Sequence, residues 1–217
     1  MTSPYEKFDF TPEVLEKFAH FAALLRETNA KINLLSRKDT DELEYRHIAF
    51  CAAISKFFTP EKGARIADVG TGGGLPGIVE AILYPQAEVL MFDGVGKKIR
   101  AISEMIAELK LPNAAAFNTR IEERKDSFDY ATGRSVCALP LFFSFVKKRL
   151  RHGKKGNLEN GVIYFKGGAL EDALAQNKIL PDAEFDLQKF FADAAYEGKR
   201  ISAFSTRKVL AGARFLA

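Results

Sequence analysis

The sequence has few of the residues and patterns that mark several classes of protein. It contains only two cysteines, Cys51 and Cys137, and three histidines, so it matches neither a disulfide framework nor a metal site. It has no apolar run of about 18 residues, the length of a membrane-spanning helix. Its start, MTSPYEKFDF, lacks the basic and then apolar segments of a signal peptide. We therefore expect a cytoplasmic monomer with no metal and no membrane partner.

What is present is typical of a soluble globular protein. The chain has 217 residues, of which 47% are hydrophobic and 28% charged. The net charge of +4 and the pI of about 9.0 permit an anionic partner. The basic excess gathers near a predicted helix end at Gly153, in Lys147, Lys148, Arg149, Arg151, Lys154 and Lys155. Two interpretations stay open: a solvated last turn that complements the helix dipole, or a contact with nucleic acid.

The pattern of apolar residues divides the chain in two. Residues 1–62 are predicted to form an N-terminal helical extension, with one helix starting at Thr11 and Pro12 and a second near Asp39, where Glu42 completes a capping box. Residues 63–217 are predicted to form one domain in which strands alternate with helices, which implies a parallel sheet covered on both faces.

The expected strands and helices of this domain follow in order along the chain. We expect strands over residues 65–69, 88–93, 114–119, 128–133 and 161–167, with helices over 76–85 and 97–111. Two more strand-like runs, 183–191 and 200–210, are joined by a polar loop around Glu197 and Gly198 and are expected to pair antiparallel. The predicted fold is α/β, a doubly wound, mostly parallel, seven-stranded Rossmann-like sheet.

The stretch Asp68 to Gly77, DVGTGGGLPG, contains two glycine-loop patterns. From Gly72 it reads G-x-G-x-x-G, the pattern of dinucleotide-binding loops. That register would extend the strand through a charged residue and a glycine, and would place Asp68 near a pyrophosphate. From Asp68 it reads acid-x-G-x-G-x-G, with the turn starting at Gly70. S-adenosylmethionine carries a sulfonium and an ammonium, so a carboxylate near the loop is then favourable. The register favours the methyl donor.

Two later positions fit an adenosine ligand and also have structural alternatives. Asp93 follows the second strand, where a carboxylate can accept both ribose hydroxyls of either NAD or S-adenosylmethionine; the alternative is a cap for the helix from Lys97. Thr119 and Glu122 follow the third strand and fit a capping box, which the local sequence alone favours.

Together, these residues resemble a known family. DVGTGGGLPGI, FDGVGKKIRAI, TRIEE and TGRSVCAL, with the N-terminal NAKINLLSRKDTDELEYRHI, are similar to the bacterial small-subunit rRNA guanine-N7 methyltransferases known as RsmG or GidB. The resemblance covers residues 24–168 well and is weaker after them. It implies S-adenosyl-L-methionine as cofactor and 16S rRNA or the small ribosomal subunit as partner.

The resemblance also implies roles for individual residues. Arg134 matches an arginine expected at the methyl-transfer site and is the one candidate catalytic residue. The residues expected to hold the cofactor are Gly70, Thr71, Gly72, Leu75, Asp93, Ile121, Glu122 and Arg134. Lys166 and Arg200 match positions near the ends of the last strands and are expected to contact substrate. The chain departs from the family at Ser135, where an alanine is usual, and at Ile201, where a histidine is frequent.

Methyl transfer to guanine N7 is consistent with the absence of a recognisable catalytic base or nucleophile in the sequence. Guanine N7 has a free lone pair, so methyl transfer to it needs positioning and charge stabilisation rather than a base. The N-P-P-[YF] motif used for exocyclic amines is absent after the fourth strand, and Cys137 is interpreted as a small buried residue rather than a nucleophile. Lys97, Lys98 and Arg100 are candidate phosphate contacts, with a solvated helix face as the alternative.

Alternative functions are a methyltransferase for a small molecule or protein, an NAD-linked oxidoreductase and a non-catalytic RNA-binding module.

Overall fold

The computed structural model describes residues 3–35, 42–167 and 179–213. Its first helix, α1 (Pro12–Lys31), starts as predicted: the side chain of Thr11 accepts a hydrogen bond from the backbone N–H of Val14, and Pro12 occupies the first turn. The buried stripe of α1 is Phe18, Phe21, Ala22 and Leu25, so this helix packs its apolar face against the rest of the molecule.

The second helical segment is irregular. It consists of a π-helix, η2 (Glu44–Ile48), then α2 (Ala49–Ala52) and a 3-10 turn, η3 (Ala53–Lys56). The predicted cap at Asp39 lies outside the described residues. The segment buries five apolar side chains that recur along it: Leu43, Ile48, Cys51, Ile54 and Phe58.

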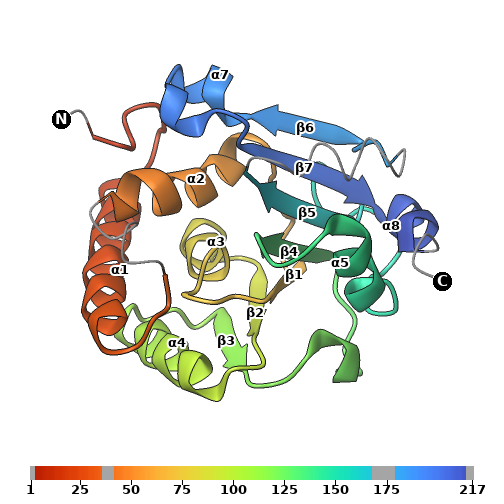
Figure 1. The fold of residues 1–217 in the computed structure, drawn as a ribbon, viewed down its shortest axis with the longest axis horizontal. Coiled ribbons are helices and arrows are strands. Elements are labelled where there is room, and N and C mark those ends of the chain that lie inside the picture. Colours follow the sequence, from red (N-terminus) through yellow and green to blue (C-terminus); the bar gives the residue numbers. More distant parts are fainter. Residues whose placement is uncertain (1–2, 36–41, 168–178, 214–217) are drawn as a thin grey trace.

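A seven-stranded sheet forms the centre of the molecule, in the order β3-β2-β1-β4-β5-β7-β6 (Figure 1). Neighbouring strands from β3 to β5 run parallel, whereas β7 runs antiparallel to both β5 and β6. The strands are β1 (Arg65–Val69), β2 (Glu88–Phe92), β3 (Ala114–Phe117), β4 (Tyr130–Arg134), β5 (Gly161–Lys166), β6 (Ala183–Asp186) and β7 (Arg200–Ser205). The predicted fold class is confirmed.

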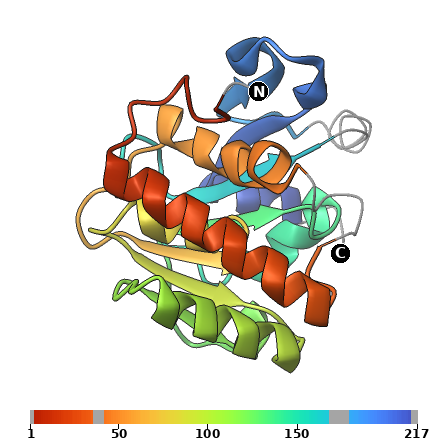
Figure 2. The same cartoon turned by 90° about the vertical axis from the view of Figure 1, so that its left-hand side faces the viewer.

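Alternation along the strands places two apolar cores on the two faces of the sheet. In β1, Ile66 packs into a core with α1, α2, α3 (Gly77–Leu83) and α4 (Gly96–Glu108), whereas Ala67 and Val69 pack into a second core with α5 (Leu139–Val146) and α8 (Thr206–Gly212). Figure 2 shows α1 crossing the first face, with α2 and α4 on either side of it. The extension and the sheet share this core, so the division between residues 1–62 and 63–217 stays a prediction.

Three expectations about element boundaries were wrong. The run 183–191 is only half strand, because the side chain of Asp186 accepts the Lys189 N–H and starts α7 (Leu187–Phe191). The run 200–210 likewise becomes α8 after Ser205. The helix before the basic cluster, α5, ends at Val146 rather than near Gly153. In the two C-terminal runs apolar residues continue after the backbone changes conformation, so periodicity alone could not locate the change.

The part of the chain that the structure describes contains no helix long and apolar enough to cross a membrane. Among the same residues there is also no group of three or more histidine, cysteine or acidic side chains arranged to hold a metal ion.

Candidate active site

The glycine loop begins directly after β1. The backbone N–H groups of Gly70 and Thr71 both donate to the carbonyl of Phe92, at 2.8 and 3.0 Å, which turns the chain away from the strand. Gly70, Gly72 and Gly74 have φ angles of 73°, 57° and 83°, which residues with a β-carbon rarely adopt. The turn therefore starts at Gly70, as the methyl-donor register predicts, and the strand does not continue to Gly72.

Asp68 lies beneath this loop rather than in it. Its side chain is fully buried, and Oδ2 accepts the backbone N–H of Gly77 at 2.9 Å, at the start of α3. The close approach requires a glycine, because a β-carbon at position 77 would lie 2.7 Å from the same oxygen. The carboxylate thus lies near the loop, as expected, and supports it through this hydrogen bond to the start of α3.

A second buried acid adjoins Asp68. Glu80 on α3 is fully buried and accepts a hydrogen bond from the hydroxyl of Thr132 at 3.1 Å. Burial, with Asp68 nearby, raises the pKa of Glu80 well above its usual range. Burial also raises the pKa of Asp68 to about 6, against the opposing effects of its hydrogen bonds and of the Arg134 guanidinium. Two acids this close disfavour the doubly ionised state.

Asp93 joins the loops that follow β1 and β2. Its Oδ2 accepts the backbone N–H of Gly72 at 3.1 Å, and its Oδ1 accepts that of Val95 at 2.9 Å. The helix α4 begins at Gly96 without a side-chain cap, so the alternative that Asp93 caps this helix is wrong. Its carboxylate is instead held at the carboxyl ends of the parallel strands, where α/β sheets bind ligands.

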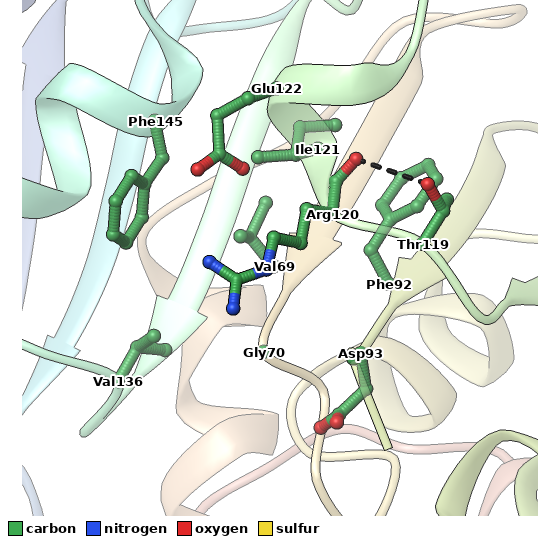
Figure 3. A pocket seen from close by; sticks show the side chains of 11 residues that line it. Val69, Gly70, Phe92, Asp93, Thr119, Arg120, Ile121, Glu122, Val136 and Phe145 are labelled. Carbon is green, nitrogen blue, oxygen red and sulfur yellow. Dashed lines mark hydrogen bonds between the residues drawn. The ribbon is translucent and has the colours of Figure 1, made fainter. Parts of the chain in front are cut away.

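A cavity of about 230 Å³ opens beside this carboxylate (Figure 3). Its far wall is the segment after β3, where Ile121 is buried and Glu122 is exposed. The predicted capping box is absent: the 3-10 turn η4 (Ile121–Glu123) has no side-chain cap, and the Thr119 hydroxyl donates to Glu123 at 2.8 Å. The lining residues are Val69, Gly70, Phe92, Asp93, Gly94, Thr119, Arg120, Ile121, Glu122, Val136 and Phe145.

The lining fits an adenosine group. Val69, Ile121 and Val136 form apolar walls on which a purine can pack, and the carboxylates of Asp93 and Glu122 lie at separate places on the rim. Carboxylates are suited to ribose hydroxyls and to a cationic sulfonium, whereas they repel a pyrophosphate. Arg120 is the one basic side chain of the lining, and Figure 3 shows it extending over this space. The residues present are therefore compatible with S-adenosylmethionine.

The cofactor residues expected from the sequence are only partly brought together. Gly70, Asp93, Ile121 and Glu122 line the cavity. Thr71 and Leu75 are buried in the loop, 1% and 3% exposed, and do not line it, and Gly72 contacts the site through its hydrogen bond to Asp93. The roles of these residues in cofactor binding stay predictions.

Arg134, the last residue of β4, is not among the residues that line this cavity. Its Nη1 is 2.7 Å from Nδ1 of His47, a residue of η2. It is also close enough to Asp68 and Cys51 to oppose the rise that burial causes in the pKa of each. Arg134 thus lies where the extension meets the ends of the strands.

The expected substrate contacts fall into two groups. Lys97, Lys98 and Arg100 are at the start of α4 and form no ion pair with the residues that the structure describes. Lys166 is 5% exposed, and its Nζ is 3.0 Å from Glu184. Arg200 is 2.9 Å from the same carboxylate, so an internal ion-pair network already holds Lys166 and Arg200. A role in substrate binding stays a prediction for all five.

Comparison with known proteins identifies the family. The family model described as GidB, rRNA small subunit methyltransferase G, matches residues 14–194. The chain belongs to this family. Ribosomal RNA small subunit methyltransferase G of Flavobacterium psychrophilum is 38% identical over 89% of this chain and 91% of its own. The same-named protein of Chlorobium chlorochromatii is 41% identical over 76% and 69%. These matches confirm the resemblance drawn from the motifs.

Among solved structures, a ribosomal protein L11 methylase from Lactobacillus delbrueckii subsp. bulgaricus aligns with 65% of this chain and 72% of its own, at 21% identity and a TM-score of 0.47. A likeness of this level carries no argument about function.

The prediction from sequence did not include several residues of the site. Phe145 and Val136 reach the cavity from α5 and from the loop before it, and no spacing rule connects them to the glycine loop. His47 was visible in the N-terminal motif that supported the resemblance, but nothing in the sequence indicated its contact with Arg134, 87 positions away.

Proposed function

We propose that this protein transfers a methyl group from S-adenosylmethionine to N7 of a guanine in small-subunit ribosomal RNA. The observation that carries the proposal is its membership of the rRNA small subunit methyltransferase G family across residues 14–194. The loop and cavity support it, because they offer apolar walls and carboxylates to an adenosine group. When bound, the cofactor supplies an electrophilic methyl group on its sulfonium.

The protein residues then have mainly to position the reactants. In our proposal, Asp93 accepts the ribose hydroxyls, Ile121 and Glu122 flank the adenine, and Arg134 organises the transfer site. N7 attacks with its own lone pair, so no side chain has to remove a proton before transfer. Burial raises the pKa of the Cys137 thiol, which opposes the thiolate that cytosine C5 chemistry requires. Arg134 can donate to the guanine or to the cofactor carboxylate through a planar fork.

A basic surface next to the cavity supports RNA as the substrate. A second cavity, of about 280 Å³, shares Glu122 and Phe145 with the first and is also lined by Ser144, Lys147, Lys148 and Arg149. In the described parts of the chain, none of these three cations forms an ion pair, and Nε of Arg149 is buried without a hydrogen bond. By contrast, Arg151 pairs with Asp129 and Lys155 with Glu61, at 3.6 and 3.5 Å.

This division makes Lys147, Lys148 and Arg149 the part of the basic cluster available to RNA phosphates. Lys97, Lys98 and Arg100 are further candidates, and Lys166 and Arg200 would contact substrate only by exchanging their present acidic partners.

We further propose that the protein acts as a monomer in the cytoplasm, where the small ribosomal subunit is found. The N7 atom of A-form RNA lies in a deep groove, so the target guanine must be splayed out of its helix.

The direct test is transfer of a labelled methyl group. Purified protein is incubated with labelled S-adenosylmethionine and, in separate reactions, with small ribosomal subunits, with naked 16S rRNA and with small-molecule acceptors. We expect label in the RNA, and strand cleavage at the labelled guanine after borohydride and aniline treatment, because N7 methylation leaves a cationic ring. Labelled RNA that resists this cleavage would contradict the N7 assignment, and label only in other acceptors would contradict the RNA substrate.

A further inference from the structure

The contact between His47 and Arg134 has a defined direction. A guanidinium carries five N–H donors and no acceptor, so at 2.7 Å Arg134 donates and Nδ1 of His47 accepts. The imidazole must then be neutral, with its proton on Nε2. It holds Arg134 without adding a second positive charge beside it. Among the residues that the structure describes, Arg134 forms no other side-chain hydrogen bond, so its other N–H groups can face the reactants.

The segment that carries His47 is fixed from two sides. Its neighbours Leu43 and Ile48 are 1% and 0% exposed and anchor η2 in the core. On the other side, the hydroxyl of Tyr45 donates to Asp193, and its ring packs against Tyr196 with ring centroids 5.1 Å apart. Five residues in π-helical conformation are rare and frequently mark functional sites. The imidazole is thus presented at a set position rather than on a mobile arm.

From these contacts we infer that His47 is a positioning residue for the methyl-transfer reaction: it orders the Arg134 guanidinium toward the reacting groups. This inference rests on the proposed function, because it assigns Arg134 to the transfer site. An arginine side chain loses rotamer entropy when it is fixed. If His47 orders the Arg134 side chain before the substrate binds, this entropy is lost during folding and not on reaching the transition state. The N-terminal extension then contributes directly to the site.

Two substitutions separate positioning from simple packing. His47→Leu removes the acceptor at similar volume, and we expect turnover to fall about ten-fold or more while the KM for RNA changes little. His47→Asn keeps an acceptor close to the position of Nδ1, and we expect it to restore most of the turnover. Thr11→Ala is the control: it removes the side-chain cap of α1, so it should lower stability without lowering turnover.

A double-mutant cycle tests whether His47 acts through Arg134. In the Arg134→Ala background, His47→Leu should cause no further loss of turnover. Additive losses, or equal losses for His47→Asn and His47→Leu, would overturn the inference. ¹⁵N NMR of histidine-labelled protein gives an independent readout: His47 should show an unprotonated Nδ1, which changes in Arg134→Ala. An Nδ1-protonated ring would also overturn it. Wild-type protein that methylates no RNA would overturn the proposed function, while the NMR measurement still decides the pairing.

Discussion

The carboxylate of Asp93 accepts the backbone N–H of Gly72 at 3.1 Å and so joins the loops that follow two adjacent strands. The same carboxylate is the candidate ribose ligand, so in the proposed complex one side chain would both shape the glycine loop and contact the cofactor. Its second oxygen accepts the N–H of Val95, so both oxygens are already oriented toward this edge of the sheet before a ligand arrives.

Asp93→Ala is expected to weaken S-adenosylmethionine binding about ten-fold or more, because charge-assisted hydrogen bonds contribute about 1.5–3 kcal/mol. It should also lower stability by about 1 kcal/mol, since two backbone N–H groups lose their acceptor. Isothermal calorimetry and urea denaturation measure the two effects. Asp93→Asn keeps one carbonyl oxygen and should recover stability more than affinity. Unchanged cofactor affinity in both variants would remove Asp93 from the site.

Arg134→Ala is expected to lower turnover by about a hundred-fold or more while changing stability much less. Arg134→Lys should restore little, because a single ammonium cannot replace a planar fork of donors. Steady-state kinetics with small ribosomal subunits and thermal denaturation test both statements. Near-normal turnover in either variant would show that Arg134 does not organise the transfer.

Simultaneous alanine substitution of Lys147, Lys148 and Arg149 should weaken RNA binding and make it less sensitive to salt. The slope of log K against log salt should fall by about 0.7–0.9 for each phosphate that the protein no longer neutralises, and cofactor affinity should not change. The matched control replaces Lys17, Lys31 and Lys56 with alanine. This removes the same charge, but these lysines already pair with acidic residues. Equal slopes for wild type and the 147–149 variant would return this cluster to the solvated-surface interpretation.

The buried acids predict a pH dependence of stability. Burial raises the pKa of Asp68 from its ordinary 3.8 to about 6, so the folded state binds this proton more tightly than the unfolded state. The contribution of Asp68 to stability is therefore largest at low pH and declines as pH rises from about 4 through 6.

Asp68→Asn removes this dependence, so its stability relative to wild type should improve between pH 5 and pH 7.5. Part of the dependence has already been lost by pH 5, so the improvement over this interval is on the order of 1.4 kcal/mol, the equivalent of about one pKa unit. Glu80→Gln should change in the same direction, because burial raises the pKa of Glu80 as well. Urea denaturation at the two pH values measures both. A difference from wild type that is the same at pH 5 and pH 7.5 would contradict the raised pKa of Asp68.

Features that depend on a few neighbouring residues were predictable from the sequence. Thr11 and Pro12 start α1 because the capping oxygen and the fixed φ act within one turn. The register of the glycine loop followed from Asp68 and Gly70, which do not suit a continuing strand or a pyrophosphate site, and the structure shows the turn starting at Gly70 with positive φ. The alternation of apolar strands and helices was enough to predict a doubly wound parallel sheet.

Features that depend on residues far apart in the sequence were decided only by the tertiary structure. Lys166 and Arg200 carry charges that suit an RNA contact, yet pairing of β5, β7 and β6 brings both to Glu184. Packing of the extension against the sheet brings His47 to Arg134 across 87 positions. Local sequence fixes backbone conformation through φ, ψ and short hydrogen bonds, whereas the partner of a charged side chain depends on which segments the shared core brings together.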